Sequence, residues 1–250
     1  MKRSAVRTAL CAAFALTCLS SAASAGEVDD ILAKVDKAQS PGKDQVGVMK
    51  MTIKDKGGNA KVRQLAIKQM GTDFRLVRFQ SPAEVKGVCF LSRGENEMYI
   101  FMPDFGKVRR IASHTKTESF MGSDFSYDDM GSGKMTDKYD GKIAKKEGDL
   151  VTIELTPKKG ADSDVKRRVL VVDTRYFIAV RGENYDANDK LVKETVQEDI
   201  KQASGNWIAG RITAKNLREG SSTVLEMSET RFDTGLKEDD FSQRNMKRSD

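Results

Sequence analysis

Apolar and polar residues alternate along most of this chain with the two-residue period of β-strands. Met49, Met51 and Ile53 occupy every second position, with Lys50 and Thr52 between them. Similar segments follow up to residue 111 and again between residues 150 and 232. Turns rich in glycine and asparagine separate many of them. The pattern predicts about eleven strands with short connections, and therefore one antiparallel sheet.

Two segments depart from this alternation. Residues 27–39 place Val28, Leu32 and Val35 at helical spacing, which predicts one N-terminal helix with an apolar face. Residues 112–145 follow neither period and are predicted to form a helical or loop lid. Because only these two segments are available to cover an open sheet face, the predicted fold is mainly β. We expect a curved, incomplete antiparallel β-barrel closed by the helix and the lid.

The first 25 residues have the pattern of a cleavable signal peptide. Basic residues precede an apolar run over 9–19, and Ala23-Ser24-Ala25 supplies the small residues of a cleavage position. The run is shorter than the roughly 20 residues that span a bilayer. We expect cleavage before Gly26, export to the periplasm and a single mature domain over 26–250. Lipid attachment at Cys18 is the alternative, although Thr17 is a poor residue for an attachment box.

Removal of this peptide changes the charge and the cysteine inventory. Three of the 43 basic residues leave and all 37 acidic ones stay, so the net charge falls from +6 to about +3. Such a mixed surface excludes the basic footprint of a nucleic-acid-binding protein. Cys89 remains as the single cysteine, so no internal disulfide is possible, and its apolar neighbours predict burial. No later segment is apolar enough to cross a membrane, and we expect a monomer.

No group of residues in the sequence indicates catalysis. His114 is the only histidine, it lies in a polar stretch, and no nucleophile elbow accompanies it. One histidine and one mature cysteine leave no ligand set for structural zinc. We therefore expect a protein that is not an enzyme and that needs neither a metal nor a cofactor.

The most unusual stretch is residues 120–130, which mixes two Phe, one Tyr and two Met with three Asp. Neither a regular strand nor a regular helix would mix residue types in this way, so we expect a shaped part of the lid. Its apolar contacts are predicted to be Phe120, Met121, Phe125 and Tyr127. The block of candidate site residues is Phe120, Met121, Gly122, Ser123, Asp124, Phe125, Ser126, Tyr127 and Asp128.

A polar latch for the lid is predicted from charges nearby in the sequence. Arg109 and Arg110 lie about a dozen residues before Asp124 and Asp128. Charge-assisted hydrogen bonds between these arginines and aspartates would hold the lid to the sheet. A solvated run of charges is one alternative. A metal site is another, although the spacing lacks the pattern and the bidentate glutamate of a calcium loop.

Methionine and phenylalanine are abundant, with eleven of each against one tryptophan. Methionine is flexible and polarisable, so a set of them suits a surface that accepts irregular apolar ligands. Filling of an ordinary core is the alternative explanation. The alternation of the strands predicts these cavity-lining candidates: Met49, Met51, Ile53, Leu76, Met98 and Ile100.

The order of the motifs resembles that of the periplasmic outer-membrane lipoprotein-sorting proteins related to the carrier LolA. The resemblance covers about residues 27–245. It rests on the arginine-bearing residues 75–79, Lys86-Gly87, residues 108–111 and the block 120–127, followed by Tyr185-Asp186 and by Trp207, Ile208 and Gly210.

This resemblance implies a curved, incomplete β-barrel closed by helices, with an apolar cavity for acyl chains. It implies a carrier that takes lipid-modified cargo from the inner to the outer membrane without catalysis, with an inner-membrane exporter and an outer-membrane acceptor as partners. The match is to the broader branch rather than to LolA itself, so the cargo is either a lipoprotein or another lipid. Two other functions stay open: a periplasmic sensor or adaptor that binds a lipidated or apolar partner, and an envelope hydrolase acting through His114.

Overall fold

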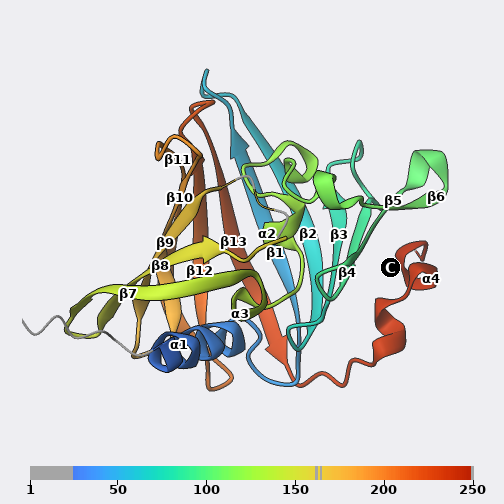
Figure 1. The fold of residues 1–250 in the computed structure, drawn as a ribbon. Helices are drawn as coiled ribbons and strands as arrows, with labels where there is room; N and C mark the ends of the chain where they lie inside the picture. The colour runs from blue at the N-terminus through green and yellow to red at the C-terminus, as the bar shows by residue number, and fades with distance from the viewer. Residues whose placement is uncertain (1–24, 161–162, 164, 249–250) are drawn as a thin grey trace, which may run out of the picture.

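A computed structural model of the chain describes residues 25–160, 163 and 165–248, and one antiparallel sheet dominates it. The described strands lie in the order β6-β5-β4-β3-β2-β1-β13-β12-β11-β10-β9-β8-β7 (Figure 1). Neighbours in the sheet are also neighbours in sequence, except that β1 pairs with β13 and joins the two halves. The strands are β1 (Asp44–Lys54), β2 (Ala60–Met70), β3 (Phe74–Ser81), β4 (Cys89–Arg93), β5 (Glu97–Met102), β6 (Lys107–Arg110), β7 (Tyr139–Glu147), β8 (Leu150–Pro157), β9 (Arg167–Asp173), β10 (Ile178–Tyr185), β11 (Leu191–Ala203), β12 (Asn206–Asn216) and β13 (Ser221–Phe232).

The prediction of a mainly β, open antiparallel fold is confirmed, but the described residues form thirteen strands rather than about eleven. The strand that the prediction missed is β7, which begins within the predicted lid. The lid therefore ends at residue 138 and not at 145. β7 is an edge strand whose side chains are largely charged and exposed. Only Tyr139, Gly141 and Ile143 alternate toward partial burial. The many charged residues of this edge strand therefore obscure its two-residue alternation in the sequence.

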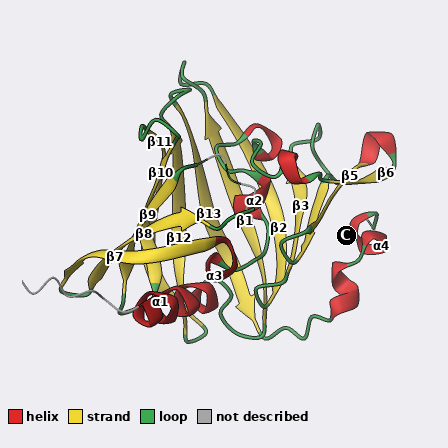
Figure 2. Cartoon of the chain, viewed as in Figure 1, coloured by secondary structure: helices red, strands yellow, loops and turns green. Residues whose placement is uncertain are grey.

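Helices are few, and apart from α1 they are single turns (Figure 2). The predicted N-terminal helix is confirmed as α1, with its start and end shifted by one or two residues. The predicted signal peptide lies outside the described residues except for Ala25, the first residue of α1. The helical elements are α1 (Ala25–Ala38), η1 (Pro103–Phe105), η2 (Ser113–Thr115), η3 (Phe120–Gly122), α2 (Tyr127–Met130), α3 (Met135–Lys138), η4 (Glu238–Phe241) and α4 (Gln243–Met246).

The sheet curves around α1 and the lid, and this side is called the inner face below (Figure 1). Two apolar clusters lie on it. The first joins inner side chains of β1 to β5 with Phe120, Phe125 and Met130 of the lid. The second joins Leu32 and Val35 of α1 with inner side chains of β8 to β10. The apolar face predicted for the N-terminal helix therefore packs on the second half of the sheet.

A C-terminal segment covers the opposite, outer face of β3 to β5. Phe241 and Met246 are fully buried there, and they pack with Leu76, Cys89 and Leu91. Burial of Cys89 confirms its prediction as a small apolar core residue. The prediction that Leu76 lines the cavity is wrong, because Leu76 lies on this outer face. Alternation failed here since both faces of β3 are covered, so residues 76–79 are all buried.

Asp44, at the start of β1, fixes the course of the C-terminal segment. Its carboxylate accepts hydrogen bonds from Thr234 Oγ1 and from the backbone N–H groups of Thr234, Gly235 and Leu236, at 2.6 to 3.0 Å. Burial alone would raise the pKa of Asp44, but these four hydrogen bonds hold it below its usual value. The segment is thereby led from the end of β13 toward the outer face.

Candidate functional site

The lid, residues 112–138, crosses the inner face of the sheet and reverses direction in one tight turn. Met121 has a φ of 52° and Gly122 a φ of 77°, so two successive residues take the left-handed conformation. The turn is closed by the Phe120 N–H, which donates to the Phe125 carbonyl at 2.7 Å. This local geometry explains why the block fits neither a strand pattern nor a helix pattern.

The underside of the lid is apolar and fits into the first half of the curved sheet. The Phe120 ring lies 5.8 Å from that of Phe79 and 5.4 Å from that of Phe90. Tyr127 stands edge-on to Phe120, with 5.3 Å between the ring centroids. Phe125 packs into the same cluster. The structure thus brings the four predicted apolar lid residues onto one surface, because Met121 also packs against this cluster.

Asp124 ties the turn of the lid to β13. Its backbone N–H donates to Thr223 Oγ1 at 2.9 Å, and Thr223 Oγ1 donates to Asp124 Oδ2 at 2.6 Å. Ser221 Oγ also donates to this carboxylate. Thr223 is fully buried. On the opposite side, Arg63 Nη1 of β2 donates to the Met121 carbonyl at 2.6 Å. The turn is therefore held between two strands that flank β1.

The next two aspartates of the lid form ion pairs with lysines. Asp128 Oδ1 lies 2.5 Å from Nζ of Lys138, at the end of α3. Asp129 Oδ2 lies 2.5 Å from Nζ of Lys193 in β11. All four side chains are 15 to 27% exposed, so these pairs are shielded from water more than an ordinary surface pair. Asp129 also closes a capping box with Ser126 at the start of α2.

The predicted latch between Arg109 or Arg110 and Asp124 or Asp128 is wrong. Both arginines are exposed on the edge strand β6. Arg110 Nη2 donates to the Asn96 carbonyl at 3.1 Å, and the Arg109 guanidinium lies 5.5 Å from the centre of the Phe105 ring. The aspartates are engaged instead by α3, β11 and β13. Closeness in sequence misled the prediction, because folding brings residues 64 to 99 positions away to Asp129 and Asp124.

Electrostatics favour the charged form of Asp129. Burial alone would raise the pKa of this carboxyl group. The positive charges of Lys193 and Arg168, together with hydrogen bonds from Lys193 and the Ser126 N–H, instead hold it well below its usual range. Asp129 is therefore ionised at every physiological pH, and its pair with Lys193 attaches the lid to β11.

A second connection joins the lid to α1. Asp36, which is buried, accepts hydrogen bonds from the Met135 N–H at 2.8 Å and from Thr136 Oγ1 at 3.0 Å. The bond from Met135, with a further one from the Thr136 N–H at 3.3 Å, satisfies free N–H groups at the start of α3. The two elements that cover the inner face are therefore tied to one another as well as to the sheet.

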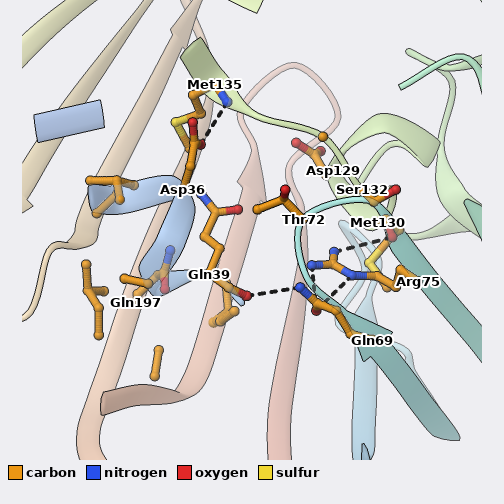
Figure 3. Close-up of a pocket in the computed structure, with 18 of the residues that line it drawn as sticks. Asp36, Gln39, Gln69, Thr72, Arg75, Asp129, Met130, Ser132, Met135 and Gln197 are labelled. Atoms are coloured by element: carbon orange, nitrogen blue, oxygen red, sulfur yellow. Dashed lines mark hydrogen bonds between the residues drawn. The ribbon is translucent and has the colours of Figure 1, made fainter. Parts of the chain in front are cut away.

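A cavity of about 300 Å³ lies between α1, the lid and the inner face (Figure 3). This volume is at the small end of ligand pockets, which span about 300 to 1,000 Å³. Its apolar wall is contributed by α1, the lid and the strands β1 to β3, β10, β12 and β13: Val35, Ala38, Met49, Ile67, Val77, Phe125, Met130, Met135, Ile178, Ala209, Ile212, Leu225 and Met227. Trp207, the single tryptophan of the sequence, also lies in this wall.

The predicted cavity-lining residues divide into groups. Met49 lies in the cavity wall. Met51, Met98 and Ile100 face inward but are packed in the cluster beneath the lid. Ile53 belongs to that cluster and also borders a second, more polar hollow of about 470 Å³, which shares Phe125 and Asp129 with the cavity. The sequence prediction missed the contributions of β10, β12 and β13, because no local pattern shows which distant strands curve to face β1.

One polar group of the cavity wall is built around Gln69 and Arg75 (Figure 3). Gln69 Oε1 accepts hydrogen bonds from Arg75 Nε at 3.2 Å, Arg75 Nη2 at 2.9 Å and Gln45 Nε2 at 2.9 Å. Arg75 Nη1 lies 3.4 Å from the Met130 carbonyl of the lid. Burial lowers the pKa of Arg75 to about 10, so the guanidinium remains charged near neutral pH.

Other candidate chemistry lies apart from the cavity. His114 is exposed in η2, at the beginning of the lid. Within the described ranges, no group of three or more His, Cys, Asp or Glu side chains is arranged to hold a metal ion. The helices that the structure describes include none long and apolar enough to cross a membrane.

The fold and the site define a class of protein: a curved, open β-sheet that holds an apolar cavity under a lid. Solved structures share this architecture. A DUF1329 family protein from Desulfovibrio piger is 28% identical with a TM-score of 0.82, over 89% of this chain and 98% of that one. A protein from Vibrio parahaemolyticus, described as an outer membrane lipoprotein-sorting protein domain, is 30% identical with a TM-score of 0.80, over 90% and 100%. A LolA superfamily protein from Nitrosomonas europaea shares the fold at 18% identity and a TM-score of 0.72, over 86% and 97%.

A family model with the description "Uncharacterized protein" matches residues 71–248. No curated protein matches the chain. On the likeness to the Vibrio parahaemolyticus protein, the chain belongs to the outer-membrane lipoprotein-sorting protein family, and it shares its fold with the LolA superfamily protein. The resemblance predicted from the sequence motifs is thereby confirmed.

Proposed function

We propose that this protein is a periplasmic carrier that binds acyl chains of lipoproteins or other lipids in the cavity and moves them from the inner to the outer membrane. The observation that carries the proposal is the apolar cavity enclosed by a separate lid. The description of the Vibrio parahaemolyticus relative supports sorting of lipid-modified cargo. The signal-peptide pattern of residues 1–25 supports a periplasmic location.

The energetics of acyl chains fit a cavity with a movable cover. Hiding a chain from water is worth about 0.8 kcal/mol per buried CH₂, so one long chain contributes on the order of 10 kcal/mol. A carrier must shield this surface during transit and then release it. A segment that opens and closes over a preformed apolar wall meets both needs.

The contacts of the lid suit a segment that an acyl chain of the ligand can displace from the inner face. Its apolar side chains Phe120 and Phe125 occupy the inner face of the sheet, where an acyl chain of the cargo would find the same surroundings. Its attachments to the sheet, Asp129 to Lys193 and Asp124 to Thr223, are polar contacts that can break and reform. In this proposal the acyl chain displaces part of the lid on loading, and the lid returns on release.

We propose that the protein transfers its cargo without catalysing a reaction. The carrier requires no nucleophile, metal or cofactor, because loading and release only move cargo between apolar environments. Its partners would be an inner-membrane exporter that supplies the cargo and an outer-membrane acceptor that receives it. We propose that it works as a monomer, since a soluble shuttle needs only one cavity.

Transfer between vesicles tests the proposal. Donor vesicles hold either a fluorescent single-chain lipid or a fluorescent lipidated peptide, and acceptor vesicles hold neither. The mature protein should accelerate movement of at least one probe. Ile212→Phe should slow the transfer several-fold, because Ile212 lies in the cavity wall, faces inward opposite Leu225, and a larger side chain there narrows the cavity.

Lys215→Phe is the matched control, because Lys215 is exposed on the same strand, one position beyond the inward-facing Ala214. It should leave transfer unchanged. If wild-type protein accelerates neither probe, or if both variants slow transfer equally, the carrier function is contradicted.

A further inference from the structure

Several cations line the cavity. Lys138 pairs with Asp128, Arg168 lies near Asp129, and Lys134 is exposed. Arg75 places a further positive charge in this wall.

Arg75 shares the inner face of β3 with Val77, which also lines the cavity, whereas Leu76 faces the other side. Arg78 likewise points outward, and its guanidinium donates to the Asn245 and Met246 carbonyls of the C-terminal segment. Of the two arginines in this strand, only Arg75 reaches the cavity.

The contacts of Arg75 within the described residues are with neutral groups only. Two N–H groups donate to Gln69 Oε1, and Nη1 donates to the Met130 carbonyl over a long 3.4 Å. A guanidinium carries five N–H donors. Three of them are used by these contacts, so two remain for another acceptor.

The carboxylates of the cavity wall are bonded to residues other than Arg75. Asp36 accepts from the start of α3, Asp128 pairs with Lys138 and Asp129 pairs with Lys193. Gln69 Oε1 already accepts a third hydrogen bond, from Gln45. The positive charge of Arg75 is therefore not neutralised by a bonded carboxylate of the described chain.

An ionised group away from water is costly unless it is paired with an opposite charge and hydrogen-bonded. Burial lowers the pKa of Arg75, but the pKa stays far above neutral pH. The guanidinium therefore remains protonated, and its charge still needs a partner. A cation retained under these conditions is suited to an anion supplied by a ligand.

We propose that Arg75 binds the anionic group of an acyl-chain ligand, either a carboxylate or a phosphate, while the chain lies against Ile67, Val77 and Leu225. This inference rests on the proposed function and narrows its cargo. The acyl chains of a lipoprotein anchor are joined through neutral ester and amide links. A free fatty acid or a single-chain phospholipid instead carries a negative charge that would pair with Arg75. A ligand with one acyl chain also suits the small cavity.

Trp207 supplies a fluorescence signal for binding without any label, because it is the single tryptophan and lies in the cavity wall. Delipidated mature protein is titrated with oleate, with single-chain oleoyl lysophosphatidic acid and with neutral monooleoylglycerol. We expect wild-type protein to bind at least one of the two anionic lipids at least tenfold more tightly than the neutral lipid. The tighter of the two identifies the ligand group as carboxylate or phosphate.

Arg75→Gln keeps hydrogen-bonding capacity but removes the charge. It should weaken the preferred anionic lipid at least tenfold and leave the neutral lipid within twofold. Arg75→Lys keeps a charge and should retain most of the preference for the anion. Lys50→Gln, which removes an exposed charge of β1, should change none of the affinities.

Two results would overturn this inference while leaving the carrier function in place. One is equal binding of neutral and anionic lipids by wild-type protein. The other is an equal loss of neutral and anionic binding in Arg75→Gln, which would assign Arg75 only to holding the lid through Met130. Failure of wild-type protein to bind any of the three lipids would contradict both the inference and the proposed function.

Discussion

Single side chains decide how firmly the lid is held. Asp129 accepts from Lys193 and from the Ser126 N–H, so one carboxylate joins the lid to β11 and also caps α2. Its partner lysine is only 17% exposed. Loss of this carboxylate would leave a poorly hydrated lysine without a counter-charge, which is more damaging than loss of an exposed pair.

Asp129→Asn should therefore loosen the lid. Breaking a fully buried ion pair costs about 3 to 5 kcal/mol, and partial exposure here reduces the expected loss to roughly 2 kcal/mol. Hydrogen exchange of the amides in residues 112–138 would measure it. Glu147→Gln, in an exposed pair with Lys145, is the control and should change exchange little. Unchanged exchange in Asp129→Asn would exclude the ion pair as the attachment.

The pH dependence of that loss follows from the lowered pKa of Asp129. A carboxyl group with a lowered native pKa contributes its full stability above its unfolded pKa, near ~4, and loses it as the pH falls through the native value. The difference between wild type and Asp129→Asn should be constant from about pH 8 to pH 5 and shrink below about pH 4. Urea unfolding at several pH values would measure this, and a difference that grows on acidification would contradict the assignment.

At this scale the sequence predicted the kind of interaction but not the partners. That the aspartates of residues 124–128 would hold the lid through polar contacts follows from their chemistry. That Asp124 would meet Thr223, and Asp128 would meet Lys138, depends on how β13 and α3 are placed in space. The burial of Cys89 could be predicted because its immediate neighbours are apolar.

Among the elements, the lid is the one that has to move in the proposed function. It is joined to β13 through Asp124 and Thr223, to β11 through Asp129 and to α1 through Asp36. Opening requires these contacts to separate while the sheet stays intact. A covalent link at one of them would keep the lid closed.

The paired substitution Asp124→Cys and Thr223→Cys should lock the lid when oxidised, since the Asp124 N–H and Thr223 Oγ1 are 2.9 Å apart. We expect lipid uptake by the oxidised form to fall at least tenfold and to return on reduction. Arg211→Cys with Glu226→Cys, at directly opposed exposed positions of β12 and β13, is the matched control. Normal uptake by the locked form would show that the lid does not gate the cavity.

The C-terminal segment is the element that the sequence described least well. Its composition is largely polar, which does not predict a packed segment, yet Phe241 is fully buried. Because this segment covers the outer face, β3 has two buried faces and its alternation no longer identifies the inner one. The outer face of β1 is exposed or partly exposed from Val46 to Lys54, so its alternation remains readable and Met49 and Met51 were assigned to the correct side.

Phe241→Ala should destabilise the fold without affecting the cavity. Removing a buried phenylalanine side chain typically costs about 3 to 5 kcal/mol. Urea unfolding should show a loss of this size, while lipid affinity per folded molecule stays unchanged. Leu217→Ala, at a residue that is 46% exposed, should cost little. If Phe241→Ala abolished lipid binding in a folded protein, the outer face would belong to the site.

For the whole molecule, pairing of β1 with β13 brings the first and the last strand together in the middle of one curved sheet. α1 covers the second half of the inner face and the underside of the lid fills much of the first, so the cavity remains between them. The open β-sheet and its two covers could be predicted from periodicity. The position of the cavity could not, because it depends on curvature and on which strands face one another.

Native mass spectrometry of mature protein purified from the periplasm without detergent tests the central claim most directly. We expect a bound acyl lipid or acylated protein, released on denaturation, and a several-fold lower bound fraction in Ile212→Phe but not in Lys215→Phe. Protein that is empty on isolation, and that stays empty after incubation with lipid vesicles, would contradict the account.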